Sequence, residues 1–295
     1  MSKTGSAAKV KLNSFDDLFG TEQPQTGTEQ VQEIALSELH EFKGHPFKVL
    51  DDEKMQETME SIREHGVLMP GIARPMKDGG YEIIAGHRRR HACELVGLTT
   101  MPMFIRDYTD DEATIIMVDS NIQREDILPS EKAKAYFMKY EAVKHQGKKG
   151  KGNSLDEVGE TAGESAKTVQ RYIYLAHLSD ALLDMVDKKK IGIVQGVELS
   201  FLTEQQQEWV QVVLEETGVI ISTVQVSRLK EYGKSDELTL PMVRLILTEP
   251  KPIERKVTIK ADKISRYFPE EYSSEEIEKV IYQLLEEWSL SESRK

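Results

Sequence analysis

The sequence predicts an α+β domain near the amino terminus, an all-α domain after it, and a small α/β-containing segment at the carboxy terminus. Short strand-like runs alternate with helical patterns up to about residue 107, helical periodicity then continues to about residue 232, and a last amphipathic stretch follows two prolines. We expect a flexible tail at 1–30, an α+β domain at 31–126, an all-α domain at 127–247 and a carboxy-terminal segment at 256–295.

Strand and helix signals alternate in the amino-terminal domain. Residues 31–36, 67–75 and 81–84 resemble strands, and Asp78-Gly79-Gly80 between the last two favours a hairpin turn. Residues 51–65 predict a helix, and its apolar positions share one face: Met55, Met59 and Ile62. This mixture indicates a small domain built on a sheet.

The composition narrows the classes of function. The chain has 295 residues, of which 39% are hydrophobic and 31% charged, and its net charge is -12. This negative net charge disfavours a nucleic-acid-binding surface over the whole protein. Residues 120–177, however, carry 10 basic against 8 acidic side chains, so we expect any DNA contacts there. The chain has no long apolar run, no secretory signal and a single cysteine, Cys93, so we expect a cytoplasmic protein without a membrane partner.

A glycine followed by an arginine cluster gives the strongest signal for a site. The segment Gly86-His87-Arg88-Arg89-Arg90-His91-Ala92 follows the strand at 81–84 and opens a helix. Such a junction gathers free backbone N–H groups, the positive end of a helix dipole and guanidinium groups, which together suit a phosphate. Taken alone, such an arginine cluster is more often a solvated helix face. A second polar cluster, Ser120-Asn121-Ile122-Gln123-Arg124-Glu125-Asp126, follows about thirty residues later.

Residues 153–175 predict a helix-turn-helix. Ser154 and Glu157 are spaced as a capping box for a short helix, Gly163 suits a tight turn, and a second helix starts near Ser165. Gln and Arg side chains read base edges in a major groove, whereas Ser, Thr and Lys reach phosphates. An ordinary helical hairpin is the alternative. The expected DNA-contacting residues are Ser165, Lys167, Thr168, Gln170, Arg171 and, in the basic loop before them, Lys148 and Lys149.

Both ends of the chain carry possible interaction segments. Residues 275–288 predict an amphipathic helix whose wide apolar stripe must be covered, either within its own segment or by a second copy. Ser273 and Glu276 are spaced as its capping box. Residues 10–19 place apolar anchors inside the polar tail.

The order of these segments resembles the ParB partition proteins and their Noc relatives. The resemblance covers about residues 31–235 and rests on segments 66–74, 85–92 and 121–126 and on the helix-turn-helix. It implies a CTP-binding amino-terminal domain, a central DNA-binding domain and carboxy-terminal dimerisation. It further implies that a homodimer binds a specific palindromic site in double-stranded DNA, closes with CTP and Mg²⁺, and slides as a clamp. A ParA-like ATPase is the partner implied for residues 1–20.

The resemblance also assigns site residues by position. The family's two nucleotide boxes fall on Gly86, His87, Arg88 and Arg89, and on Asn121, Gln123, Arg124 and Glu125. Asn121 is the expected contributor to a Mg²⁺ shell. His87 and Ser120 stand where the family usually has glutamate, and the nearest carboxylate, Asp119, would point about 100° away from Ser120 on a helix. We therefore expect CTP binding to be more secure than hydrolysis, and no catalytic residue is assigned.

Two other classes of function compete with this one. A helix-turn-helix transcriptional repressor with a vestigial nucleotide pocket is favoured by His87 and Ser120. CTP-dependent retention on closed DNA would distinguish the two classes. A nuclease or phosphoryl-transfer enzyme ranks last, because the two boxes contain neither a convincing carboxylate pair nor a nucleophile. The sequence does not distinguish a chromosomal from a plasmid origin.

Overall fold

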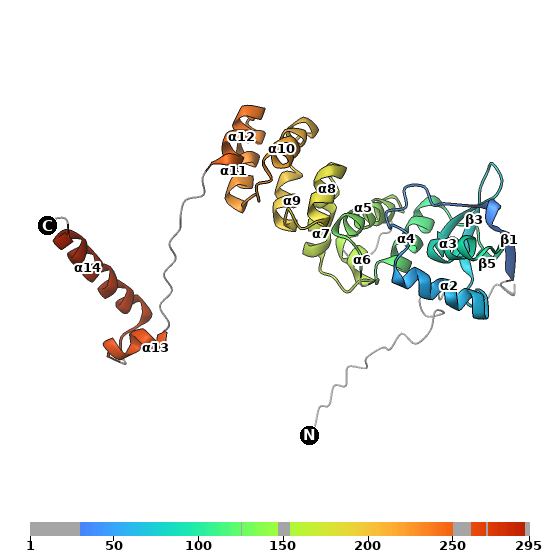
Figure 1. Cartoon of the computed structure of the whole chain (residues 1–295), viewed down its shortest axis with the longest axis horizontal. Coiled ribbons are helices and arrows are strands. Elements are labelled where there is room, and N and C mark those ends of the chain that lie inside the picture. The colour runs from blue at the N-terminus through green and yellow to red at the C-terminus, as the bar shows by residue number, and fades with distance from the viewer. Residues whose placement is uncertain (1–29, 125, 147–153, 250–260, 270, 293–295) are drawn as a thin grey trace, which may run out of the picture. The chain divides into compact units, whose positions relative to one another are not determined.

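The computed structural model describes residues 30–124, 126–146, 154–249, 261–269 and 271–292 (Figure 1). Contacts divide the chain into two units, Met1–Thr248 and Glu249–Lys295. The described residues do not include Glu125, the basic loop with Lys148 and Lys149, or residues 1–29 and 250–260. The predicted domain limits at 126 and 247 stay predictions.

A five-stranded mixed sheet forms the amino-terminal part of the first unit. Its strands are β1 (Val31–Ala35), β2 (Leu39–His40), β3 (Gly71–Pro75), β4 (Tyr81–Ala85) and β5 (Thr100–Ile105), in the order β1-β5-β3-β4-β2. The predicted hairpin is present, since β3 and β4 pair antiparallel and Gly79 and Gly80 have φ of 93° and 75° in the turn. β5, antiparallel to β1 and parallel to β3, was not identified from the sequence, because Pro102 and the absence of polar alternation mask it.

Two helices pack with this sheet, α2 (Glu53–His65) and α3 (His87–Val96). The side chain of Asp52 caps α2 by accepting a hydrogen bond from the Met55 N–H at 2.9 Å. The predicted apolar face of α2 is buried, and Cys93 of α3 is fully buried in the same core. The short 3₁₀ turn η1 (Leu36–Glu38) connects β1 to β2.

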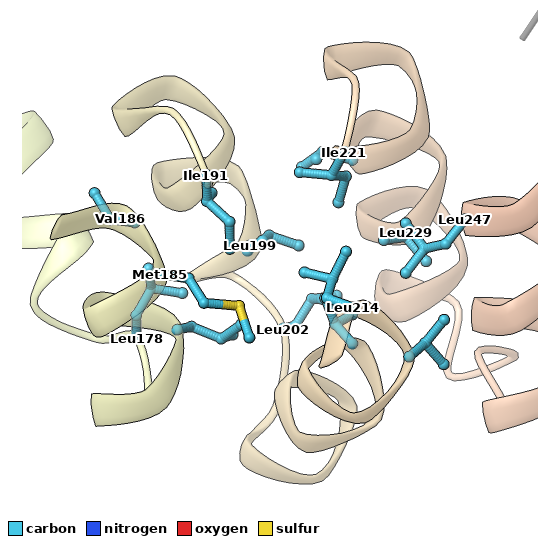
Figure 2. Packing of buried hydrophobic residues seen from close by; sticks show 14 of the residues in the cluster. Leu178, Met185, Val186, Ile191, Leu199, Leu202, Leu214, Ile221, Leu229 and Leu247 are labelled. Carbon is cyan, nitrogen blue, oxygen red and sulfur yellow. The ribbon is translucent and has the colours of Figure 1, made fainter. Parts of the chain in front are cut away.

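Helices form the remainder of the first unit. They are α4 (Asp110–Asn121), α5 (Pro129–His145), α6 (Ser154–Glu160), α7 (Ala166–Leu175), α8 (Asp180–Asp187), α9 (Ile193–Leu199), α10 (Glu204–Thr217), α11 (Thr223–Lys234) and α12 (Leu240–Thr248). Leucine, isoleucine and methionine side chains from α8 to α12 interlock in one apolar cluster (Figure 2). α12 extends beyond the helical periodicity predicted to end near 232, and its Val243 and Leu247 are fully buried.

A second apolar cluster continues from the sheet into the helices. It joins Ile72 and Ile84 of the sheet to Met117 of α4, Tyr136 of α5 and Val169 of α7. Packing is therefore continuous across residue 126, and the positions of α4, α5 and α7 depend on one another.

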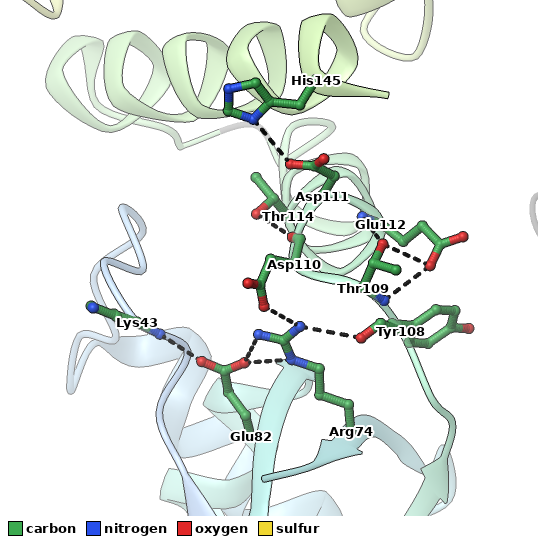
Figure 3. A network of polar contacts seen from close by, with 10 residues as sticks. All are labelled: Lys43, Arg74, Glu82, Tyr108, Thr109, Asp110, Asp111, Glu112, Thr114 and His145. Carbon is green, nitrogen blue, oxygen red and sulfur yellow. Dashed lines mark hydrogen bonds and ion pairs between the residues drawn. The ribbon is translucent and has the colours of Figure 1, made fainter. Parts of the chain in front are cut away.

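A polar network fixes the start of α4 against the β3–β4 hairpin (Figure 3). Arg74 donates to the Glu82 carboxylate at 2.7 and 2.6 Å, and its Nη1 reaches Asp110 Oδ1 at 2.6 Å. The Lys43 N–H donates to the other Glu82 oxygen at 3.1 Å. Because Arg74 and Glu82 are largely shielded from water, the bonds between them are strong, whereas the contact to α4 is made through the exposed Asp110 carboxylate and contributes less.

Helices α6 and α7 meet in a tight turn. Val158, Val169 and Ile173 are buried, and Gly163 has the positive φ, 67°, that the turn needs. The Ser165 Oγ caps α7 by accepting from the Thr168 N–H at 3.3 Å. A Cβ on Gly159 would lie 2.3 Å from the Glu164 carbonyl oxygen, so the chain approaches this glycine too closely for a side chain.

The second unit contains α13 (Ala261–Ile264), the 3₁₀ turn η2 (Ser265–Tyr267) and α14 (Ser274–Glu292). The predicted capping box is formed, since Glu276 accepts from the Ser273 N–H at 2.8 Å and Ser273 accepts from the Glu276 N–H at 3.4 Å. Leu284 and Leu285 are 58% and 52% exposed, so the segment leaves part of the apolar stripe uncovered. No described helix has the length and apolarity required to cross a bilayer.

Candidate functional site

The two predicted polar clusters meet at a cavity of about 250 Å³ in the first unit. The loop after β2, the loop before β3, the junction of β4 with α3 and the end of α4 form its walls. Its lining residues are His45, Lys48, Val49, Met69, Pro70, Ile72, Ala85, Gly86, His87, Arg88, Arg89, Ser120, Asn121 and Arg124. Segments distant in the sequence therefore contribute to one site.

The charge of this cavity is one-sided. Four of the described residues that line it are cationic: Lys48, Arg88, Arg89 and Arg124. The described lining residues include no aspartate or glutamate. A partly enclosed space with this lining attracts anions, and guanidinium groups match the oxygens of phosphates.

Gly86 shapes the part of the cavity that lies at the start of α3. It precedes α3 with a φ of 112°, and a Cβ there would lie 3.2 Å from the Cα of Gly71. The first intrahelical bond runs from the Arg90 N–H to the Gly86 carbonyl at 2.9 Å, so α3 itself does not use the N–H groups of residues 87–89. These donors and the helix dipole favour a bound phosphate.

The two arginines of this box have different partners. Arg88 contacts the carboxylate of Asp52, and this hydrogen bond holds the pKa of Asp52 below its ordinary value. Arg89 donates to the carbonyls of Met69 and, at 2.9 Å, Pro70, while burial lowers its own pKa. Arg89 therefore fixes one wall of the cavity, whereas Arg88 could exchange an exposed carboxylate for a ligand phosphate.

His87 is buried against a second histidine. Its ring lies 3.9 Å from that of His45, and its Nε2 accepts from the Phe42 N–H at 3.5 Å. Burial, together with the neighbouring His45 and Arg90, lowers the pKa of His87 to about 3. The ring is therefore neutral near pH 7, and it cannot replace the negative charge of a glutamate.

This buried ring predicts a pH-dependent stability. Between pH 6.5 and about 3 the unfolded chain protonates His87 and the folded protein does not, so stability falls as the pH falls. Lowering the pH from 6.5 to 5.5 should cost about 1 kcal/mol through this group. Thermal melting of the wild type and His87→Gln over this range measures the difference. His65→Gln, at an exposed position, is the control, and equal slopes for wild type and His87→Gln would contradict the prediction.

The second polar cluster divides between the cavity and the α6–α7 turn. Asn121 donates its amide to the Met117 carbonyl at 2.9 Å, which leaves Oδ1 as its ligand-binding group, and Arg124 lines the cavity beside it. Gln123 is not among the described lining residues, because it donates to the Thr161 carbonyl at 3.1 Å. Ser120 Oγ donates to the Met117 carbonyl at 3.0 Å.

The described residues suit an anionic ligand better than a protein-bound metal ion. They contain no group of three or more histidine, cysteine, aspartate or glutamate side chains placed to hold a metal. Asp119, the carboxylate nearest Ser120 in sequence, is engaged by Lys139 at 2.5 Å. Ser120 and Asn121 offer only neutral oxygens, so a Mg²⁺ ion here would depend on the oxygens of its ligand.

His45, Lys48 and Val49 line the cavity but were not predicted from the sequence. They lie in the loop after β2, where no periodicity or turn motif indicates a site. Long-range bonds place this loop, since the Lys48 N–H donates to Glu131 at 2.8 Å. A sequence signal for such residues would require knowledge of the tertiary contact.

Five of the residues predicted to contact DNA lie on α7 or at its N-cap. Ser165, Lys167, Gln170 and Arg171 are exposed and Thr168 is half-buried, whereas Val169 on the opposite side is fully buried. The Gln170 amide donates to the Tyr174 hydroxyl at 3.4 Å.

Comparisons with known proteins agree with these observations. Residues 20–122 match the family described as the ParB N-terminal domain. The probable chromosome 1-partitioning protein ParB of Deinococcus radiodurans is 32% identical over 72% of this chain and 70% of that protein. A nucleoid occlusion protein of Halalkalibacterium halodurans is 30% identical over 62% of this chain and 61% of that protein.

Solved structures give a weaker likeness. The C-terminally truncated ParB of Caulobacter crescentus complexed with CTP-gamma-S is 25% identical, covering 68% of this chain and 98% of that chain, with a TM-score of 0.31. Whole chains do not superpose at this score, so the sequence relationship decides the family. With a third of the residues identical over most of both proteins, the chain belongs to the ParB family.

Proposed function

We propose that this protein segregates DNA by binding a palindromic double-stranded site and closing around DNA as a CTP-dependent sliding clamp. The observation that carries the proposal is the cavity with four cationic side chains and, among its described lining residues, no carboxylate. Family membership supports this function, since curated relatives are named chromosome-partitioning and nucleoid occlusion proteins.

The triphosphate of CTP is proposed to lie at the start of α3. The N–H groups of residues 87–89 donate to it, and Lys48, Arg88 and Arg124 balance its charge. A neighbouring hollow shares these three cationic residues but is also lined by Asp52, Glu57, Asp126 and Glu131, so it suits the phosphates less well than the cavity does. Bound Mg²⁺ would neutralise part of the phosphate charge, with the Asn121 Oδ1 as the predicted protein ligand. Hydrolysis is proposed to be slow because His87 is neutral and Asp119 is engaged by Lys139.

The pair of helices α6 and α7 is proposed to act as a helix-turn-helix. Gln170 and Arg171 would read base edges, while Ser165, Lys167 and Thr168 would hold phosphates. Lys148 and Lys149 are proposed as additional backbone contacts, which would make binding sensitive to salt.

Two further partners complete the proposal. The partly uncovered apolar stripe of α14, with Leu284 and Leu285 exposed, supports a carboxy-terminal homodimer. Residues 1–20 are proposed to contact a ParA-like ATPase. The protein would then act on the nucleoid or on a plasmid in the cytoplasm.

Calorimetric titration with CTP, ATP, GTP and UTP, each with Mg²⁺, tests the proposed function. CTP-selective binding, together with CTP-dependent retention on closed circular DNA, is the expected result. Binding to a DNA site without affinity for any nucleotide would instead indicate the alternative, a helix-turn-helix transcriptional repressor with a vestigial pocket. Rapid DNA-stimulated CTP turnover would contradict slow hydrolysis.

A further inference from the structure

A buried lysine lies between the cavity and the α6–α7 turn. Lys139 of α5 has only 4% of its side chain exposed, and its Nζ lies 2.5 Å from Asp119 Oδ1. The same ammonium group donates to the Val158 carbonyl at 3.3 Å and to the Thr161 Oγ1 at 3.2 Å. Three different segments therefore share one shielded charge, where polar contacts are strong and costly to break.

The first of these segments is the cavity wall itself. Asp119 lies one residue before Ser120 and two before Asn121, both of which line the cavity at the end of α4. Successive side chains on a helix differ in direction by about 100°, so one helical turn presents Asn121 to the cavity and Asp119 to Lys139. A ligand that shifts this turn also shifts Asp119.

The second segment is the turn that leads into α7. Gln123 adds a parallel contact by donating to the Thr161 carbonyl at 3.1 Å. The turn is tied to α6, since the Glu164 N–H donates to the Gly159 carbonyl at 3.0 Å, and α6 packs tightly on α7, since a Cβ on Gly159 would lie 2.9 Å from Val169 Cγ2. Displacement of Thr161 must therefore carry the recognition surface of α7 with it.

We infer that Lys139 is a positioning residue that couples the occupancy of the cavity to the placement of α7. The inference rests on the proposed function and names the residues through which CTP changes DNA binding. A triphosphate attracts Arg124, whose N–H is bonded to the Asn121 carbonyl at 3.1 Å, so the last turn of α4 moves, and Asp119 transmits the movement through Lys139 to Thr161. Because coupling between two binding sites is reciprocal, DNA bound at α7 changes the affinity for CTP by the same factor.

The test compares the coupling itself, not either affinity alone. For each variant, the dissociation constant for DNA is measured with and without CTP, using a palindromic duplex that the wild type has selected from a random library. The variants are Thr161→Val, Gln123→Ala and the double replacement of Asp119→Asn with Lys139→Met, which leaves no unpaired buried charge. Lys134→Met is the control, because it removes an exposed lysine of α5 that pairs with Asp180.

The wild type and Lys134→Met should show the same CTP effect on DNA affinity. The CTP effect is the ratio of the DNA dissociation constants measured without and with CTP. In the double variant this ratio should lie within about twofold of one, while CTP alone and DNA alone still bind within about threefold of the wild type. An unchanged ratio, or loss of DNA binding without nucleotide, would overturn the inference. Thr161→Val, which removes only a hydroxyl, decides the matter if the double variant does not fold. A wild type that binds no nucleotide would refute the proposed function as well.

Discussion

Replacing Arg88 with alanine is expected to weaken CTP binding by roughly 10- to 100-fold. Hydrogen bonds to charged groups contribute about 1.5–3 kcal/mol, which corresponds to this range of dissociation constants. Arg88 lines the cavity from the first turn of α3, and its present partner Asp52 is a largely solvent-exposed carboxylate that a triphosphate can displace. Calorimetric titration of the purified variant with CTP measures the loss.

Two matched variants separate this contact from general effects on α3. Arg90→Ala removes a neighbouring arginine that pairs with Glu94 at 2.8 Å and does not line the cavity, so it should bind CTP within about threefold of the wild type. Asp52→Asn breaks the ion pair with Arg88 but keeps the guanidinium and should not weaken binding. Equal losses in Arg88→Ala and Arg90→Ala would show that the helix, and not the guanidinium, is responsible.

The parts of the site that the sequence predicted are those defined by local chemistry. Gly86 was identified because a strand, a glycine and a helix start determine the backbone geometry within a few residues, and the structure gives it a positive φ. Arg88 was identified from the arginine cluster and Asn121 from the family resemblance, and both line the cavity. The same local reasoning predicted the hairpin turn and the capping box of Ser273.

The parts that the sequence did not predict depend on contacts between distant segments. Lys48 lines the cavity only because its loop is bonded to Glu131 of α5. Gln123 belongs to the polar cluster by spacing, yet its amide donates to Thr161 because α4 and α6 both pack on α5. Asp119 is unavailable to the cavity for the same reason, since Lys139 engages it. β5 was missed because two neighbouring strands, rather than its own pattern, stabilise it.

Replacing Gly159 with valine is expected to lower the melting temperature by about 4–8 °C and to abolish site-specific DNA binding. The new Cβ would lie 2.3 Å from the Glu164 carbonyl oxygen and 2.9 Å from Val169 Cγ2, so the turn or α7 must move. Overpacking of this kind costs about 1–3 kcal/mol, and about 2 kcal/mol gives the stated shift in a protein of this size. Thermal melting and DNA titration measure the two effects.

CTP binding should be retained in Gly159→Val within a few fold, because the cavity lies on α3 and α4 and Gly159 is not among its lining residues. Gly163→Asn is the matched control in the same turn: a Cβ there meets nothing within 4 Å, and asparagine tolerates the φ of 67°. The control should bind DNA nearly as the wild type does. If Gly159→Val also kept wild-type DNA affinity, the close packing of α6 on α7 would not be what orients the recognition surface. Groove reading would then have to depend on another part of the chain.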